Sequence, residues 1–99
     1  MHTDPSFRMT ASDVFAIKGR GVVVLGKVES GEIRVGDEIY FNSPSGVQKI
    51  AVTGLEMFHK QIPQAVMGDT VGVLLEGLSH GDLKRGDVIS GSDADYTWS

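Results

Sequence analysis

The chain has no cysteine, three prolines, one tryptophan and no long apolar run in its 99 residues. Without cysteine it can hold neither a disulfide scaffold nor a thiolate zinc site, and it offers no cysteine nucleophile. Its longest apolar run, at 22–25, is far shorter than the roughly 20 residues that cross a bilayer. The first residues also lack the charged, apolar and small segments of a secretory leader. We therefore expect a cytoplasmic protein without a membrane segment.

Positive charge is scarce as well. Lys and Arg number 9 against 13 Asp and Glu, so the net charge is -4. Non-specific binding to nucleic acid needs many contacts between cations and phosphates, so this balance excludes a broad phosphate-binding surface. Any contact with RNA must then be local. A chain of 99 residues forms one small domain with a single core.

Branched apolar residues and glycine make up much of what is present. The sequence has 12 Val and 6 Ile against 5 Ala and 6 Leu, which favours strands because branched side chains lose rotamer freedom in a helix. The 13 glycines recur too often to leave room for a long helix. We expect strands near 11–17, 21–29, 37–42, 47–59, 69–76 and 87–90, with a short one near 63–66.

Apolar residues alternate along these segments, as they do where one side of a sheet is buried. In the segment 21–29, Val22 and Val24 share the side that we predict to face inward, whereas Leu25 and Lys27 share the outward side. The segments 37–42 and 69–76 alternate in the same way, so one face of each strand is expected to form the core.

The segment 47–59 changes phase in its middle. Ile50 and Val52 have one parity, Leu55 and Met57 have the other, and a glycine at position 54 lies between them. A bulge or bend at this glycine would turn both pairs inward, as happens at the corners of small barrels. Closure also removes exposed sheet edges. We therefore predict a small closed β-barrel of six to seven strands.

The two ends of the chain lack this alternating pattern. We expect an N-terminal tail at 1–6, the barrel at 7–91 and a C-terminal tail at 92–99. Tyr96 and Trp98 are unusual residues for a tail, which suggests that they dock on the barrel or on a partner.

No catalytic or cofactor-binding motif satisfies its own chemistry. The stretch 21–27 has the glycine and lysine spacing of a phosphate loop, but Val28 stands where a hydroxyl would hold magnesium. His2, His59 and His80 lie far apart and lack the spacing of a helical metal site. No serine lies in a nucleophile elbow. We expect no enzyme activity and no bound metal, nucleotide or cofactor.

Residues predicted to face outward form the candidate site. Apolar side chains on neighbouring strands would come close to acidic and basic ones if the strands pair as a barrel. We predict a shallow groove on the barrel wall that receives a ligand end or a protein partner. It comprises Leu25, Lys27, Glu56, Phe58, His59, Lys60 and Thr70. Because single apolar residues are common on surfaces, a cluster without function is the alternative.

Several blocks of the sequence occur together in one known family. They are DVFAIKGRGVVVLGKVESG at 13–31, IRVGD at 33–37, TGLEMFHK at 53–60, GDTVGVLL at 68–75 and RGDVI at 85–89. In this register the chain resembles domain 2 of elongation factor Tu and related translational GTPases from about residue 7 to 91. The resemblance implies a Greek-key β-barrel. It does not extend to the GTPase domain, since the chain has no phosphate loop and no guanine-selecting Asn-Lys-x-Asp.

The resemblance also implies a binding site. In elongation factor Tu the outer wall of this barrel accepts the aminoacylated 3′ end of tRNA, with the terminal adenine near a glutamate. Glu56 matches that glutamate, and a carboxylate can accept hydrogen bonds from a ribose hydroxyl or a base amine. Around it, the family's arginine, asparagine, threonine and glutamate are replaced by His59, Thr70, Leu25 and Ser12. These exchanges make the wall more apolar than that of the family.

Two functions follow from these patterns. The first is a non-catalytic, monomeric binding module that takes the tRNA 3′ end or RNA of the translation machinery. The second is a protein-protein interaction or assembly barrel whose apolar wall meets another protein and in which RNA has no role. The net charge of -4 favours the second. An enzyme of related topology is a third class, without a motif to support it.

Overall fold

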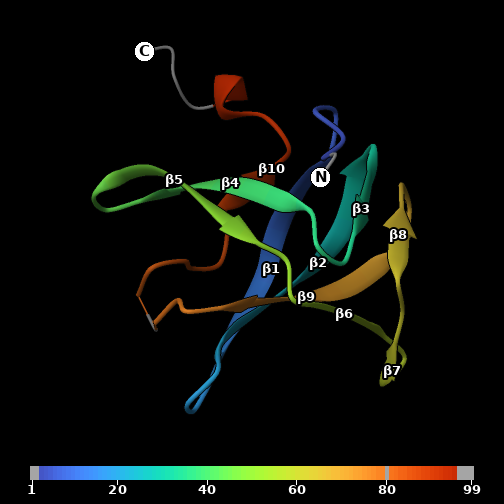
Figure 1. Cartoon of the computed structure of the whole chain (residues 1–99), viewed down its shortest axis with the longest axis horizontal. Coiled ribbons are helices and arrows are strands. Elements are labelled where there is room, and N and C mark those ends of the chain that lie inside the picture. Colours follow the sequence, from blue (N-terminus) through green and yellow to red (C-terminus); the bar gives the residue numbers. More distant parts are fainter. Residues whose placement is uncertain (1–2, 80, 96–99) are drawn as a thin grey trace.

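The computed structural model describes residues 3–79 and 81–95, so Tyr96 and Trp98 lie outside the described residues. The described residues form strands and one short 3-10 helix (Figure 1). The strands are β1 (Arg8–Ile17), β2 (Gly21–Ser30), β3 (Glu32–Arg34), β4 (Glu38–Ser43), β5 (Gly46–Ala51), β6 (Gly54–Met57), β7 (Lys60–Gln61), β8 (Gln64–Val66), β9 (Thr70–Glu76) and β10 (Val88–Ser90). The helix is η1 (Asp93–Asp95), and no helix in these ranges has the length and apolarity to span a membrane.

The strands pair in two antiparallel sheets. The large sheet has the order β5-β4-β10-β1-β2-β9-β6-β7, and β3 pairs with β8 in a separate ribbon. β5 lies at one end of this order, yet β6, which follows it closely in the chain, lies near the other end. The sheet therefore curls until its two ends approach each other (Figure 1). The predicted all-β class is confirmed.

The closed form of the barrel and its Greek-key order are not confirmed by this pairing. Within the described ranges, no ladder joins β5 to β6 or β7, so the large sheet keeps two edges. It also contains more strands than the six to seven expected, because the segment predicted as one strand at 47–59 supplies both β5 and β6 and because the short β7 adds to its edge. The sequence missed β3 and β7, whereas the short strand expected near 63–66 is confirmed as β8.

The prediction of one strand at 47–59 is wrong, because a corner divides it. β5 ends at Ala51, β6 begins at Gly54, and Val52 and Thr53 form the turn between them. The Val52 amide donates to Asp37 O at 2.7 Å and the Thr53 amide donates to Leu74 O at 3.0 Å, so the chain leaves β4 and joins β9 here. The corner thus precedes Gly54, where an added Cβ would meet only ordinary contacts with Leu74 at 3.5 Å.

The predicted alternation is confirmed where it was strongest. In β2, Val22 and Val24 are completely buried, Leu25 is half-buried and Lys27 is exposed. The corner at 52–53 brings both halves of the divided strand into phase, since Val52 and Leu55 are both 1% exposed. The rest of the core comes from β1, β2, β3, β4, β8, β9 and β10 and from two residues outside the strands, and it consists of Phe7, Met9, Ala11, Val28, Ile33, Ile39, Phe41, Ala65, Val71, Val73, Leu75, Leu83 and Ile89.

The segment before β1 is hydrogen-bonded to the sheets. The Asp4 carboxylate accepts bonds from the Ser6 hydroxyl at 2.7 Å, from the Ser6 amide at 2.8 Å and from the Glu32 amide at 3.1 Å. The Glu38 amide donates to Thr3 Oγ1 at 2.8 Å. The bonds from Ser6 stabilise the charged carboxylate and hold the pKa of Asp4 below its ordinary value. These contacts fasten the start of the chain to β3 and β4.

Candidate binding site on the outer wall

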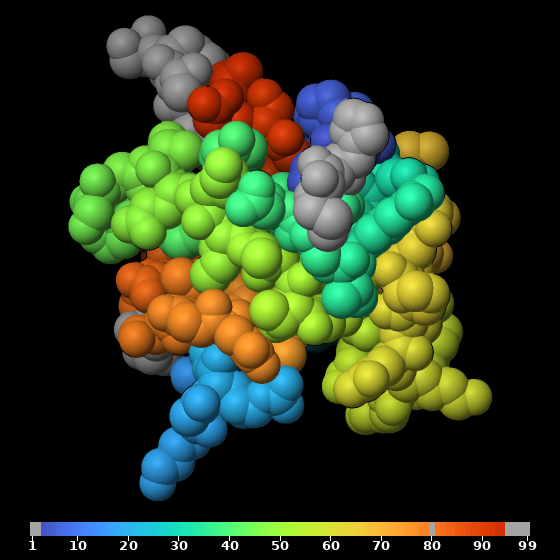
Figure 2. Space-filling view, viewed as in Figure 1, coloured from blue at the N-terminus to red at the C-terminus, as the bar shows by residue number. Residues whose placement is uncertain are grey.

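A hollow of about 650 Å³ lies on the outer side of β1, β2, β9 and β6, which we call the binding wall. Five of the predicted residues line it together: Leu25, Glu56, Phe58, His59 and Thr70. The other lining residues are Phe15, Val23, Met57, Gly68, Asp69 and Gly72. The tip of the β1–β2 hairpin and the β6–β7 hairpin protrude from the same end of the molecule, with a recess between them (Figure 2).

The two predicted lysines lie beside the hollow and do not line it. Lys27 is paired with Thr70 across the β2–β9 ladder, and Lys60 is paired with Met57 across the β6–β7 ladder. The structure thus brings five of the seven predicted residues together in one hollow and places the two lysines at its border. Whether these residues bind a ligand stays a prediction.

The register of the ladders builds the apolar floor of the hollow. Phe15 is paired with Val23, Leu25 is paired with Gly72, and Gly72 is paired with Glu56. Because paired residues project from the same face of a sheet, these side chains form two neighbouring rows, one with Phe15 and Val23 and the other with Leu25, Gly72 and Glu56. Gly72 keeps the second row low, since a Cβ there would lie 3.1 Å from Val23 Cγ1 of the first. The sequence analysis missed the roles of Phe15 and Gly72, which only the register reveals.

A strained turn forms the rim. Phe58 and His59 connect β6 to β7 as a two-residue hairpin turn, with φ angles of 54° and 64°. Such turns favour Asn and Gly, because a left-handed backbone costs other residues on the order of 1 kcal/mol or more each. The turn leaves the Phe58 side chain 86% exposed beside the hollow. An aromatic ring is thus displayed to solvent on a backbone that its own side chain disfavours.

Glu56 is the acidic group of the hollow that remains available. Within the described ranges its carboxylate takes part in no hydrogen bond and no ion pair, whereas Asp69, the other lining carboxylate, accepts the Val66 amide at 3.0 Å. The remaining glutamates all have a cationic partner within 4 Å, namely Arg8 for Glu29, Arg34 for Glu32, Lys49 for Glu38 and Arg20 for Glu76. Glu56 can therefore accept hydrogen bonds from a ligand without breaking a contact of its own.

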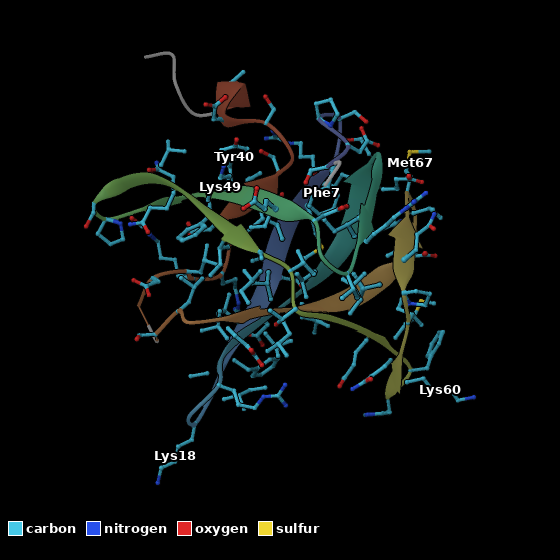
Figure 3. All side chains as sticks on the ribbon, viewed as in Figure 1. Phe7, Lys18, Tyr40, Lys49, Lys60 and Met67 are labelled. Atoms are coloured by element: carbon cyan, nitrogen blue, oxygen red, sulfur yellow. The ribbon has the colours of Figure 1, made fainter. Side chains whose placement is uncertain are left out.

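The Lys and Arg side chains also divide into those with an ion-pair partner and those without one. Six of the nine Lys and Arg side chains form an ion pair with a carboxylate. They are Arg8, Arg20, Arg34, Lys49, Lys84 and Arg85. In the part of the chain that the structure describes, the cations without such a pair are Lys18, Lys27 and Lys60. All three belong to strands of the binding wall or to their hairpins, and Lys18 and Lys60 extend away from the body (Figure 3).

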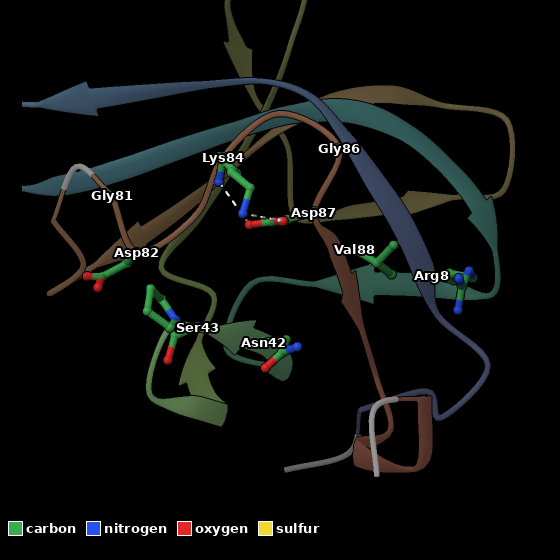
Figure 4. Close-up of a pocket in the computed structure, with 10 residues that line it drawn as sticks. Arg8, Asn42, Ser43, Gly81, Asp82, Lys84, Gly86, Asp87 and Val88 are labelled. Atoms are coloured by element: carbon green, nitrogen blue, oxygen red, sulfur yellow. Dashed lines mark hydrogen bonds and ion pairs between the residues drawn. The ribbon is translucent and has the colours of Figure 1, made fainter. Parts of the chain in front are cut away.

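A second hollow, of about 520 Å³, differs in chemistry. It lies between the end of β4 and the segment before β10, and its lining is polar (Figure 4). Lys84 Nζ lies 3.8 Å from Asp87 Oδ1, and Asp82 accepts the Ser79 amide at 2.8 Å. The charged groups of this hollow therefore already have partners, unlike Glu56 on the binding wall.

The stretch that resembled a phosphate loop lies in β2. Residues 21–27 pair with β1 on one side and with β9 on the other, so their amides belong to the sheet and cannot cradle a phosphate. His59 lies in the rim turn, while His2 and His80 are outside the described residues. Among the side chains that are described, no group of three His, Asp or Glu residues is placed to hold a metal ion.

Comparison with protein families identifies the barrel. The family model described as elongation factor Tu domain 2 matches residues 21–90. The chain belongs to this family. The match begins at the first residue of β2 and ends at the last residue of β10, so it contains most of the binding wall. β1 precedes the matched residues, yet it lies between β10 and β2 in the sheet. It therefore belongs to this elongation factor Tu domain 2 fold and supplies Phe15 to the hollow.

Proposed function

We propose that this domain is a non-catalytic binding module whose hollow takes the 3′-terminal adenosine of an RNA with a CCA end. The observation that carries the proposal is the uncommitted carboxylate of Glu56 beside the exposed ring of Phe58. A carboxylate accepts hydrogen bonds from ribose hydroxyls and from the adenine amine, and an aromatic ring stacks on a base. A volume of about 650 Å³ suits a ligand of nucleoside size.

The arrangement of charge supports a ligand of which only the end is bound. The hollow contains the carboxylates of Glu56 and Asp69 and no Lys or Arg, so it would repel a phosphate. Lys27 and Lys60 are the ladder partners of the lining residues Thr70 and Met57, so they lie at its border, where the phosphates that lead to a terminal nucleoside would pass. Binding of this kind needs few cations, which agrees with the net charge of -4.

Fluorescence anisotropy with a short labelled RNA hairpin that ends in CCA tests this proposal. Glu56→Ala is expected to weaken binding about 10-fold, which corresponds to about 1.4 kcal/mol. Glu38→Ala is the matched control, because Glu38 is also an exposed strand glutamate but lies on β4 and pairs with Lys49. The same RNA without its last adenosine should bind as weakly as the Glu56 variant does. Equal affinity for both RNAs would exclude the proposal.

A second candidate function is binding of an apolar protein surface. The observation that favours it is that apolar side chains continue past the hollow into a smaller cavity of about 80 Å³. Ile17, Val23 and Leu74 line this cavity, together with the polar Arg20 and Gln61. A terminal nucleoside would not cover Ile17, which is 36% exposed. Leu25→Asp would then abolish association with a protein partner, and Glu56→Ala would leave it unchanged.

A further inference from the structure

The two edges of the large sheet are protected to different degrees. The β7 edge is two residues long, carries Lys60 and is followed by Pro63, which has no amide to donate. Short strands, lysine and proline are the means by which natural sheets avoid pairing with other chains. The β5 edge is six residues long, has no proline and carries one charged residue, Lys49. The β7 edge is therefore the better protected of the two.

The backbone of β5 has groups that point away from the sheet. A two-residue turn joins β4 to β5, and Ser43 and Gly46 form its closing pair. Since hydrogen-bonded and non-hydrogen-bonded residues alternate from that pair, Val47, Lys49 and Ala51 direct their amides and carbonyls to the open side. Apart from bonds inside strand ladders, none of these three amides donates to the backbone of the described residues.

The side chains of β5 do not discourage pairing. Lys49 Nζ lies 3.6 Å from Glu38 Oε1, so its charge is partly neutralised within the chain. Val47 is 37% exposed, and Ile50 is partly buried against the core. The β4–β5 hairpin projects from one side of the body, away from the β6–β7 hairpin (Figure 1), and it forms a lobe of its own at the edge of the space-filling view (Figure 2).

We propose that β5 pairs antiparallel with β5 of a second copy of this chain, about a two-fold axis at Ile50. Antiparallel strands of two identical chains can be centred on Gln48, Lys49 or Ile50. Centring on Lys49 sets two like charges opposite each other, which destabilises a strand pair. Centring on Gln48 sets two polar amide side chains opposite each other. Centring on Ile50 sets Lys49 opposite the small Ala51 and brings two β-branched side chains together, the pairing that sheets favour. The new ladder is then confined to residues 49–51, because the chain turns away at Val52 and Thr53.

From the sequence we expect a monomer. The proposed contact instead gives a weak, reversible dimer. One strand pair buries little surface, so the interface falls below the size of stable complexes and its population depends on protein concentration. The interface lies on β5, whereas the candidate groove lies on β1, β2, β9 and β6. Association of two copies therefore leaves the groove accessible, and the two proposals fail or stand independently.

Cysteine cross-linking tests the register, because the chain has no cysteine of its own. A residue at the two-fold axis is opposite its own copy, in a non-hydrogen-bonded pair with about 4.5 Å between Cα atoms, which a disulfide can bridge. Under mild oxidation, Ile50→Cys is expected to give a covalent dimer at least about 10-fold faster than the neighbouring Gln48→Cys. Equal rates, or no dimer from Ile50→Cys, would overturn the register and with it the proposal.

Sedimentation velocity tests the use of the edge itself. The full chain should sediment increasingly as a dimer when its concentration rises from micromolar to millimolar. Lys49→Pro removes the outward amide and should abolish this dependence, since proline is tolerated where an edge amide faces solvent. Lys49→Thr, which removes the same charge and keeps the amide, should dimerise as the parent does. A parent that stays monomeric, or a Lys49→Pro variant that is folded by circular dichroism and dimerises fully, contradicts the proposal.

Discussion

The outer sides of this barrel differ from one another in how their charged and aromatic side chains are partnered. On the wall of β10, β4 and β5, charged groups have partners, as Lys49 and Glu38 do at 3.6 Å. On the binding wall, Phe15 and Phe58 are 51% and 86% exposed, and Glu56 has no partner among the described residues. Core packing does not require this difference, because the residues in question point away from the core.

The comparison shows which exposed side chains contribute to the fold and which do not. Surface ion pairs contribute little to stability, so the paired wall is ordinary. An exposed ring on a strained turn gives the fold nothing and costs it something. The exposed side chains of the binding wall are therefore the ones that the requirements of the fold do not explain.

The largest expected effect on stability is the difference between substitutions on the inner and the outer face of β2. Val24→Asp, at a fully buried position of β2, should prevent stable folding, since burying a lone carboxylate costs more than about 4 kcal/mol. Leu25→Asp, one residue along on the outer side, should change the free energy of unfolding by less than about 1 kcal/mol. Urea denaturation followed by circular dichroism measures both. Comparable losses would mean that the binding wall is part of the core.

A double exchange in the rim turn should separate stability from binding. Phe58→Asn with His59→Gly supplies the residues that the turn geometry favours, and should raise the free energy of unfolding by about 1 to 2 kcal/mol. The same protein should lose RNA binding because the stacking ring is gone. A variant that gains stability and keeps full affinity would remove the functional reason for the strained turn.

The two lysines beside the hollow should contribute less to RNA binding than Phe58 does, and the salt dependence of binding should reveal their contribution. Lys27→Ala and Lys60→Ala should each weaken RNA binding a few-fold and reduce the slope of log affinity against log salt by about 1. Lys49→Ala, on the other wall, should change neither quantity. Anisotropy titrations at about 50 mM and about 200 mM salt give the slopes. An identical slope for all three variants would mean that the rim does not contact phosphate.

The smallest expected effect on stability concerns Asp4, whose carboxylate accepts hydrogen bonds from within the chain. Hydrogen bonds from Ser6 lower the pKa of Asp4, so its charged form stabilises the folded chain. That contribution is complete above the pKa of the unfolded chain, about 4, and disappears as the pH falls through the lower folded value. The melting temperature of Asp4→Asn should therefore lie below that of the parent at pH 6 and approach it near pH 2. A constant difference would show that the charge of Asp4 contributes nothing.

Much of the fold and part of the site could be predicted from the sequence. Alternation placed Val22 and Val24 inside because a two-residue period leaves no other choice once one face is buried. It could not locate the corner at Val52, since parity reports only that the phase changes and not where. Phe15 escaped notice because its place in the hollow depends on the register between β1 and β2, which no local pattern encodes. Lys27 and Lys60 were predicted to line the groove but lie beside it, and this too depends on the register between strands.

Amide chemical shifts during titration with a CCA trinucleotide test the central claim most directly. The account predicts that shifts concentrate at Phe15, Leu25, Glu56, Phe58 and Thr70, which line the hollow, and that Asn42 and Lys84 of the polar hollow stay unchanged. Shifts that spread evenly over both walls, or that are confined to the polar hollow, would contradict it.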